Sequence, residues 1–277
     1  MKLFNKVAVV GIGLMGGSIA LALKQQKLCN QVIGVSRRKE TLVLAKKFGI
    51  IDSGSQDLKI ISGADLVILA TSVGLIVDLS GKISKLIGKD CLVCDVGSTK
   101  EQIVSRLENI FPKFVGCHPL AGSEKRGIAN SKADLFRNSC CILTPTKNTD
   151  KEAKEKLVKM WQAIGAKVVF MPADKHDQIL SFTSHLPHAL AFSLIAAVPK
   201  GILEFSAGGL KDTTRIAASD PQLWADILLS NKKNILKAME VFQGTLDGLK
   251  SAVKKSDKSA LKKFLKLAQN KRKILNS

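Results

Sequence analysis

The stretch Val7-Ala8-Val9-Val10-Gly11-Ile12-Gly13-Leu14-Met15-Gly16-Gly17-Ser18 decides the fold of this chain. An apolar strand runs directly into glycines spaced as GxGxxG, and an apolar helical segment follows. In such a turn Gly11 permits the tight bend, Gly13 lets a pyrophosphate approach the backbone, and Gly16 lets helix and strand pack closely. The free N–H groups of the helix N-terminus favour the anion. The stretch therefore predicts a dinucleotide-binding βαβ unit.

Strand-like runs alternate with helix-length segments over the first two-thirds of the chain, as in a doubly wound parallel sheet. Beyond Met171 the strand-like runs stop and long helical periods begin. We therefore predict an α/β protein, with a Rossmann-type domain over residues 1–171 and an all-helical domain over residues 172–277. The expected strands are Val7–Val10, Val32–Val35, Leu66–Ala70, Cys91–Asp95, Phe114–Gly116, Cys140–Thr144 and Val168–Met171.

The end of the chain is expected to form two helices. Apolar residues follow alternating steps of four and three from Ile235 to Val253, which is typical of a helix that packs against another helix. A final helix is expected to begin after Ser259.

The composition is that of a globular protein. The 277 residues are 45% apolar and 24% charged, which predicts one or two domains and excludes a disordered or fibrous chain. No run reaches the ~18 apolar residues of a membrane span, and the N-terminus has no signal-peptide layout. We expect a cytoplasmic protein with no membrane contact. The cysteines, including the pair Cys91 and Cys94 and the pair Cys140 and Cys141, are expected to be free thiols that pack in the core.

Nearly half of the formal net charge of +20 lies in the last tenth of the chain, and the rest is scattered lysine. Residues Lys250–Ser277 hold ten Lys or Arg and one acid. Because no basic run is interleaved with aromatic residues, a solvated surface is favoured over a nucleic-acid site. An anionic small-molecule substrate would suit this charge. A polyanion-binding protein that uses the basic tail is the alternative.

The second strand ends in Gly34-Val35-Ser36-Arg37-Arg38, where an NAD site usually carries an acid for the ribose hydroxyl. An arginine fork can instead pair with a 2′-phosphate. The segment favours NADP, with NAD possible, although a solvated turn would leave the same pattern. The expected cofactor-binding residues are Gly11, Gly13, Leu14, Met15, Gly16, Ser36, Arg37, Arg38, Thr71 and Ser72.

A histidine follows another expected strand, in Gly116-Cys117-His118-Pro119-Leu120-Ala121-Gly122-Ser123. His118 is thus expected at the same sheet edge as the Gly-rich turn, where it can meet a nicotinamide. The segment Asp95-Val96-Gly97-Ser98-Thr99-Lys100-Glu101 ends the strand before it. Ser98 and Glu101 have the spacing of a capping box, which by itself would explain Ser98.

These segments carry a family resemblance. With Ser184-His185-Leu186-Pro187-His188 and the segment from Gly209 to Ile216, they resemble the prephenate dehydrogenase, or cyclohexadienyl dehydrogenase, family of tyrosine biosynthesis. The matching pieces keep the family's order and spread over nearly the whole chain. HPLAG and SHLPH together are specific, whereas GxGxxG alone is not.

The resemblance implies an NAD(P)-dependent oxidative decarboxylation of prephenate to 4-hydroxyphenylpyruvate, in which hydride leaves C4 of a cyclohexadienol and CO2 is lost. In that reaction His118 would accept the proton of the 4-hydroxyl, and Ser98 would orient the hydroxyl or the imidazole. Arg215 would hold a substrate carboxylate. Further substrate-side positions implied by the resemblance are His176, Ser184, His185, His188 and Trp224.

Several alternatives stay open at this point. Arogenate, which differs from prephenate in an amino group, would serve the same machinery, and a β-hydroxyacid dehydrogenase or pyrroline-carboxylate reductase would share the domain order. His185 and His188 have a spacing that could bind a metal, but the family is metal-free and none is expected. Arg215 could be an ion-pair partner of Asp212 or Asp220. The family's helical domain makes a dimer, so a homodimer is expected.

Overall fold

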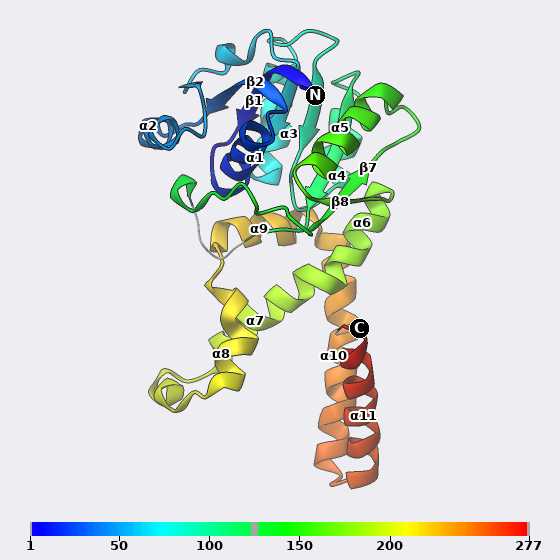
Figure 1. The fold of residues 1–277 in the computed structure, drawn as a ribbon. Coiled ribbons are helices and arrows are strands. Elements are labelled where there is room, and N and C mark those ends of the chain that lie inside the picture. Colours follow the sequence, from blue (N-terminus) through cyan, green and yellow to red (C-terminus); the bar gives the residue numbers. More distant parts are fainter. Residues whose placement is uncertain (1, 123–126, 276–277) are drawn as a thin grey trace. The chain divides into compact units, whose positions relative to one another are not determined.

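The computed structural model describes residues 2–122 and 127–275, and an eight-stranded sheet lies at its centre (Figure 1). The strand order is β3-β2-β1-β4-β5-β6-β7-β8, and the β1–β4 junction is the point where the winding reverses. This order is that of a Rossmann sheet extended by two strands. The strands are β1 (Phe4–Val10), β2 (Cys29–Val35), β3 (Ser53–Ser55), β4 (Leu66–Leu69), β5 (Leu92–Asp95), β6 (Phe114–Pro119), β7 (Cys140–Thr144) and β8 (Lys167–Phe170).

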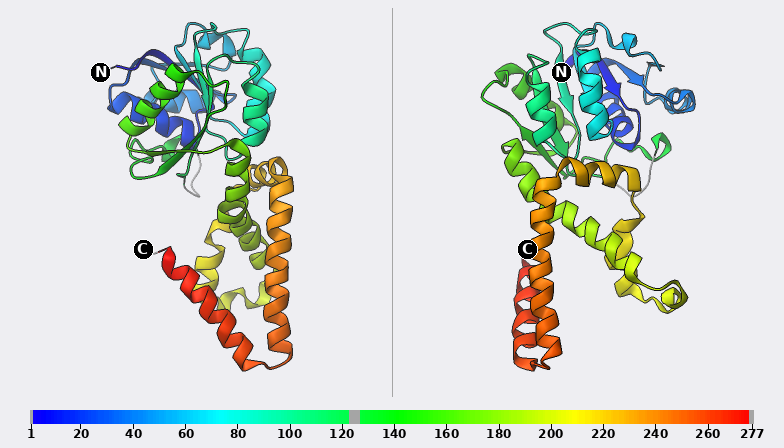
Figure 2. Two further views of the ribbon diagram at one scale, coloured as in Figure 1. Left: turned by 90° about the vertical axis from the view of Figure 1, so that its right-hand side faces the viewer. Right: turned by 180° about the vertical axis from the view of Figure 1, so that it is seen from behind.

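Helices cover both faces of the sheet, which is why its inner strands are almost continuously apolar (Figure 2). In β1, Val7 and Val9 join one apolar cluster, whereas Ala8 and Val10 join the other. The first cluster includes side chains of α1 (Leu14–Gln25), α2 (Lys39–Lys47) and α5 (Lys151–Ala163), and the second those of α3 (Val73–Ile83) and α4 (Glu101–Leu107). The predicted fold class is confirmed.

Two features of the sheet differ from the expectation. The edge strand β3 was not predicted, because Ser53-Gly54-Ser55 has no apolar pattern and is held by backbone pairing with β2. Strand β7 runs antiparallel to β6, whereas the other neighbouring strands are parallel. In the described part of the β6–β7 connection the only helix is the short η2 (Ile128–Asn130). A parallel return usually runs through a full α-helix packed on the sheet, and the described part of this connection has none.

The cysteines behave as core residues, as predicted for Cys91, Cys94 and Cys141. All three are buried, and burial raises the pKa of the Cys91 thiol to about 12. Cys140, at the start of β7, is only partly buried, so the expectation that it packs in the core is wrong. All six cysteines are free thiols.

The chain divides into two compact units, residues 1–231 and 232–277. The first holds the sheet and a run of helices, so the boundary expected after Met171 lies inside it and stays a prediction. Those helices are α6 (Ala173–Leu180), the π-helical turn η3 (Ser181–His185), α7 (Leu186–Ala197), η4 (Lys200–Phe205), α8 (Gly208–Thr214), η5 (Arg215–Ala218) and α9 (Pro221–Ser230). A shorter turn, η1 (Leu58–Ile61), precedes β4.

The continuous helical segment 173–197 is, by length and composition, apolar enough to cross a membrane. This is weak support for a span, because core helices of soluble proteins pass the same test and 33% of the apolar window is buried within the protein. Its polar residues His176, Asp177 and His185 are buried and hydrogen-bonded to other elements of the same unit. We therefore treat the segment as a packing helix.

The second unit is a helical hairpin of α10 (Lys232–Lys254) and α11 (Lys258–Ile274). Helix α11 begins where Asp257 Oδ1 accepts the backbone N–H of Ala260 at 2.9 Å. The apolar stripe of α10 is only partly covered, since Leu246 and Val253 are 43% and 60% exposed.

Candidate active site

The Gly-rich turn forms a cradle at the carboxyl edge of β1. Gly11 has φ +100°, and a Cβ there would lie 2.5 Å from the carbonyl oxygen of Ala70. A Cβ on Gly16 would lie 2.1 Å from the carbonyl oxygen of Gly11, so both positions require glycine. At Gly13, the N-cap of α1, a Cβ would meet nothing within 4 Å, and no side chain caps the helix. The open space and free N–H groups fit the pyrophosphate of a dinucleotide.

A second feature of the cradle points to a ligand. The Thr71 hydroxyl, next to the turn, is buried and has no hydrogen-bond partner among the described residues. An unpaired buried hydroxyl is costly and is explained by a polar group of a bound cofactor. Ser72 is the N-cap of α3, and Leu14 and Met15 open α1 with part of their surface exposed. The residues present therefore fit a dinucleotide.

The end of β2 carries positive charge. The backbone N–H of Arg38 donates to Ser36 Oγ at 3.2 Å, and Gln56 Nε2 donates to the Arg37 carbonyl at 2.6 Å. These bonds shape the loop while both arginine side chains remain exposed.

Beyond β5, a lysine and an aspartate form a buried ion pair. Asp95 and Lys100 are both fully buried, and Lys100 Nζ donates to Asp95 and, at 2.9 Å, to the carbonyl oxygen of Cys117. Asp95 also accepts the backbone N–H groups of Gly97 at 2.8 Å and Cys117 at 3.2 Å. Burial raises the pKa of Asp95, and the attraction of Lys100 opposes this. The pair ties the β5–α4 turn to β6.

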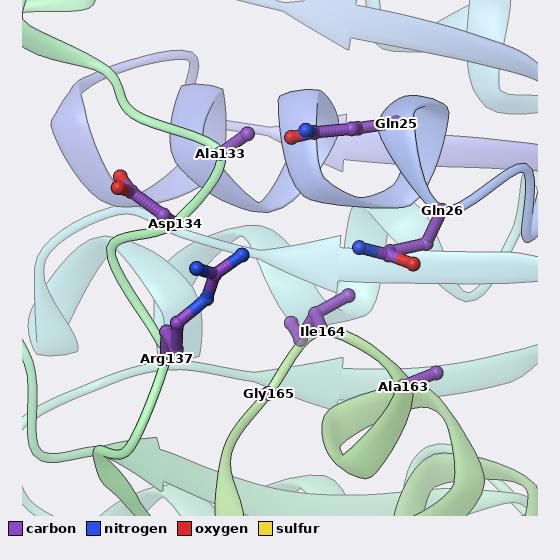
Figure 3. A pocket seen from close by; sticks show the side chains of 8 residues that line it. All are labelled: Gln25, Gln26, Ala133, Asp134, Arg137, Ala163, Ile164 and Gly165. Carbon is purple, nitrogen blue, oxygen red and sulfur yellow. The ribbon is translucent and has the colours of Figure 1, made fainter.

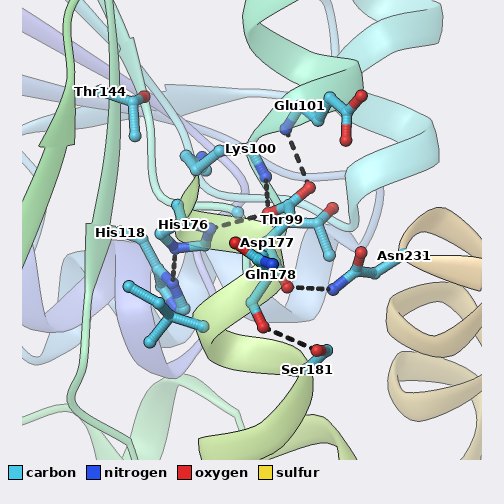
Figure 4. Close-up of polar contacts among 12 residues, drawn as sticks. Thr99, Lys100, Glu101, His118, Thr144, His176, Asp177, Gln178, Ser181 and Asn231 are labelled. Carbon is cyan, nitrogen blue, oxygen red and sulfur yellow. Dashed lines mark hydrogen bonds and ion pairs between the residues drawn. The ribbon is translucent and has the colours of Figure 1, made fainter. Parts of the chain in front are cut away.

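The predicted capping box of Ser98 and Glu101 is wrong. Helix α4 has Lys100 as its N-cap, and no side chain of its own turn caps it. Instead Asp177 of α6 accepts the backbone N–H groups of Lys100 at 2.7 Å and Glu101 at 3.0 Å (Figure 4). A carboxylate from a distant helix thus supplies the cap and stabilises the positive end of α4.

The same carboxylate begins a chain that reaches His118. His176 Nδ1 lies 2.7 Å from Asp177 Oδ1, and His176 Nε2 lies 2.8 Å from His118 Nδ1 (Figure 4). The register aligns Val10 with Leu69 and Leu69 with Asp95, and pairs Val115 of β6 with Cys94. In this register the residue of β6 level with Val10, the last residue of β1, is Gly116. His118 lies two residues further along and is therefore on the carboxyl edge of the sheet, where the cradle lies.

A second group of side chains lies further along the same helical run. Asn231 Nδ2 donates to the carbonyl oxygen of Asp177 at 2.8 Å and contacts His185 Nδ1 at 3.0 Å. His188 stacks on Trp224, with ring centroids 3.6 Å apart, and its Nδ1 contacts the carbonyl oxygen of Ser184 at 3.0 Å. His185 Nε2 is buried without a partner among the described residues. A π-helical turn carries Ser184 and His185, and such turns are frequent at functional sites.

Burial keeps this group of histidines neutral. Desolvation lowers the pKa of His118 well below its ordinary value, assisted by His176, Lys100 and His185. It also lowers the pKa of His176, against the opposing hydrogen bond to Asp177, and brings that of His185 to about 4. The pKa of His188 is lowered by desolvation and by the charge of Arg215, which places that arginine near the ring.

The structure brings His118, His176, His185, His188 and Trp224 into one connected group. Ser98 lies half-exposed in the β5–α4 turn, and no hydrogen bond between it and His118 is present in the described part of the chain. The sequence analysis gave Asp95 and Lys100 no role of their own, although both lie in a segment that carries the family resemblance. Asn231 stands in no pattern that separates it from an ordinary surface residue. Ser123, the last residue of the His118 segment, lies outside the described residues.

A hollow of about 230 Å³ lies between the carboxyl ends of α1 and α5 (Figure 3). Since α1 has 12 residues, it lies about 18 Å along that helix from the cradle. Its charged lining residues are Asp134 and Arg137, and helix carboxyl ends repel anions. We assign it no role. Across residues 2–122 and 127–275, no three potential metal ligands of the His, Cys, Asp or Glu type come together.

A nucleotide cradle and a neutral histidine on one edge of a Rossmann sheet define a dinucleotide-dependent oxidoreductase. The chain matches two family models, "Prephenate dehydrogenase, nucleotide-binding domain" over residues 19–170 and "Prephenate dehydrogenase, dimerization domain" over residues 172–267. The chain belongs to the prephenate dehydrogenase family.

Individual relatives agree with this. A prephenate dehydrogenase of Bacillus subtilis is 38% identical over 97% of this chain and 75% of its own length. The crystal structure of Aquifex aeolicus prephenate dehydrogenase with hydroxyphenyl propionate and NAD+ is 37% identical, with a TM-score of 0.93 over 98% of each chain. The structure of Synechocystis arogenate dehydrogenase is 29% identical, with a TM-score of 0.83 over 98% of this chain and 99% of that one.

Proposed function

We propose that the protein is an NAD(P)-dependent dehydrogenase that converts prephenate to 4-hydroxyphenylpyruvate and CO2. The observation that carries the proposal is the neutral His118 on the sheet edge that holds the Gly-rich cradle, in a chain of this family. When bound, the nicotinamide of the cofactor supplies the hydride acceptor. Gly11, Gly13 and Thr71 would hold its pyrophosphate end.

The protein's own residues handle the proton and the carboxylates. An imidazole with a lowered pKa is unprotonated at neutral pH, so His118 can accept the proton of the substrate 4-hydroxyl as hydride departs. Arg215, exposed near His188, suits a charge-assisted bond to a substrate carboxylate. His185 Nε2, buried and unpaired, suits a hydrogen bond to the same ligand. Ser98, on the turn between Asp95 and Lys100, is proposed to orient the hydroxyl.

NADP is the proposed preferred cofactor. Support comes from the exposed Arg37 and Arg38 at the end of β2, where Ser36 replaces the acid that would repel a 2′-phosphate. NAD remains a second cofactor, since the Aquifex aeolicus relative was crystallised with NAD+.

Arogenate is the second candidate substrate, and the structural similarity to an arogenate dehydrogenase favours including it. The two substrates differ in a keto or amino group, which one or two side chains can discriminate. A β-hydroxyacid dehydrogenase or pyrroline-carboxylate reductase loses support, because prephenate dehydrogenase models match both parts of the chain.

A cytoplasmic homodimer is the proposed form. The family model over residues 172–267 is a dimerization domain, and α10 leaves Leu246 and Val253 exposed, as a subunit interface would. Free cysteines throughout fit a reducing compartment. Light scattering coupled to gel filtration should give twice the chain mass of 29.8 kDa, and a monomer at micromolar concentration would contradict the dimer.

The decisive test is the initial rate of reduced-nicotinamide formation with prephenate and arogenate, each with NADP and with NAD. Turnover of prephenate supports the proposal, and a higher kcat/KM for arogenate would select the second candidate. His118→Asn should lower kcat by about 10²-fold or more while cofactor affinity survives. Failure of both substrates with both cofactors would refute the proposed function.

A further inference from the structure

We propose that Asp177 and His176 are positioning residues that hold His118 in the tautomer with a protonated Nδ1, so that its Nε2 is the atom that accepts the substrate proton. The inference rests on the proposed function and deepens it. Sequence similarity placed His176 on the substrate side, but it is fully buried and both of its ring nitrogens have protein partners. These contacts leave no ring nitrogen of His176 for the substrate, so we infer that it acts by orienting His118.

The chain of contacts starts at a carboxylate that is fixed in place. Asp177 receives the backbone N–H groups of Lys100 and Glu101 as well as His176 Nδ1. Because Asp177 Oδ1 already accepts the backbone N–H of Lys100, it acts as an acceptor, and His176 Nδ1 donates the proton in this contact. The hydrogen bonds from the N-terminus of α4 hold the Asp177 carboxylate in place without any substrate. The fold therefore sets the direction of the His176–Asp177 hydrogen bond.

The direction of the second bond follows from the charge state of His176. Burial lowers its pKa, so the ring is neutral and has one protonated nitrogen. With the proton on Nδ1, its Nε2 is an acceptor, and at 2.8 Å the donor must be His118 Nδ1. A neutral His118 that donates from Nδ1 has a lone pair on Nε2.

The surroundings of His118 favour the same state. The titratable groups that act on His118 are His176 from α6, Lys100 from the β5–α4 turn and His185 from η3. Asp177 of α6 and Asp95, the last residue of β5, act on His176. Lys100 repels a second positive charge, and Asp95 is already paired with it. Within the described part of the chain, His118 therefore has no direct carboxylate partner. His176 lies between it and Asp177 and orients the His118 ring.

A matched pair of substitutions separates positioning from packing. In His176→Gln an amide can still donate to Asp177 and accept from His118, because its oxygen and nitrogen reproduce the opposite polarity of the two ring nitrogens. In His176→Phe the ring volume stays but both bonds are lost. We expect kcat to fall by about 10²-fold in the Phe variant and to remain within about tenfold of wild type in the Gln variant, with KM little changed in both. Equal loss in the two variants would overturn the proposal.

A second measurement reads the tautomer without turnover. The chain has four histidines, so selective ¹⁵N-histidine labelling gives few signals, which the His176 variants and His118→Asn assign. Long-range ¹H–¹⁵N spectra at neutral pH should show His118 with Nδ1 protonated and Nε2 bare, and this state should be lost in folded His176→Phe. A protonated Nε2 on wild-type His118 would refute the proposal. If neither substrate is turned over, the proposed function fails, and the spectra still decide the tautomer.

Discussion

Two glycines of the cradle should respond in opposite ways to the same added methyl group. A Cβ on Gly13 would meet nothing within 4 Å, whereas a Cβ on Gly16 would lie 2.1 Å from the Gly11 carbonyl oxygen and 2.9 Å from Val9 Cγ1. Gly13→Ala should therefore leave folding intact but place a methyl group where the pyrophosphate must approach. Gly16→Ala should force the turn and α1 apart.

The magnitudes follow from these distances. Gly13 has φ −100°, which alanine adopts freely, so the entropy gained offsets the weaker N-cap and stability should change by less than about 1 kcal/mol. For Gly16→Ala, contacts far inside van der Waals range should cost about 1–3 kcal/mol. That lowers Tm by several degrees in a chain of this size. Cofactor affinity should fall about tenfold or more in both variants, which corresponds to a loss of about 1.4 kcal/mol.

The assay pairs thermal unfolding with fluorescence titration of reduced nicotinamide cofactor. Gly81→Ala is the control: it lies in α3, its Cβ would meet nothing within 4 Å, and it should keep wild-type affinity with equal or slightly higher Tm. Unchanged affinity in Gly13→Ala would refute the cradle as the pyrophosphate site. A wild-type Tm in Gly16→Ala would refute the steric argument.

Other perturbations test the remaining parts of the site. Replacing Arg37 and Arg38 together by Ala should raise KM for NADP about tenfold or more and leave KM for NAD nearly unchanged; equal effects on both cofactors would contradict a 2′-phosphate contact. Arg215→Ala should raise KM for prephenate about tenfold or more without changing that for the cofactor, as two-substrate kinetics would show. Because burial lowers the pKa of His185 from 6.5 to about 4, the unfolded chain takes up a proton first as pH falls. That should cost the folded state up to about 3 kcal/mol between pH 6.5 and 4. Urea unfolding at both ends of this range should show a smaller loss in His185→Gln; an equal loss would place the pH dependence elsewhere.

The sequence by itself determined the parts of this protein whose physics is local. The turn from Gly11 to Gly16 can be recognised from adjacent residues, because its tight bend and the close packing of helix on strand each require a glycine at a fixed position. Buried strands such as Leu66–Leu69 are recognisable because a sheet covered on both faces demands continuous apolar runs. The sequence also predicted His118 on the edge of the Gly-rich turn, because it follows an apolar run and parallel strands end at the same edge of the sheet.

Only the tertiary structure decided how the histidines are held. Asp177 caps α4 from 76 residues away, and His118 meets His176 across 58 residues, so no local spacing could predict either contact. The spacing of Ser98 and Glu101 predicted a local capping box, but the N-terminus of α4 is capped instead by the carboxylate of Asp177 in α6. The antiparallel β7 and the burial of Lys100 depend in the same way on which elements pack together. Short-range patterns specify elements and turns, whereas hydrogen-bond partners and tautomers depend on which of those elements become neighbours in space.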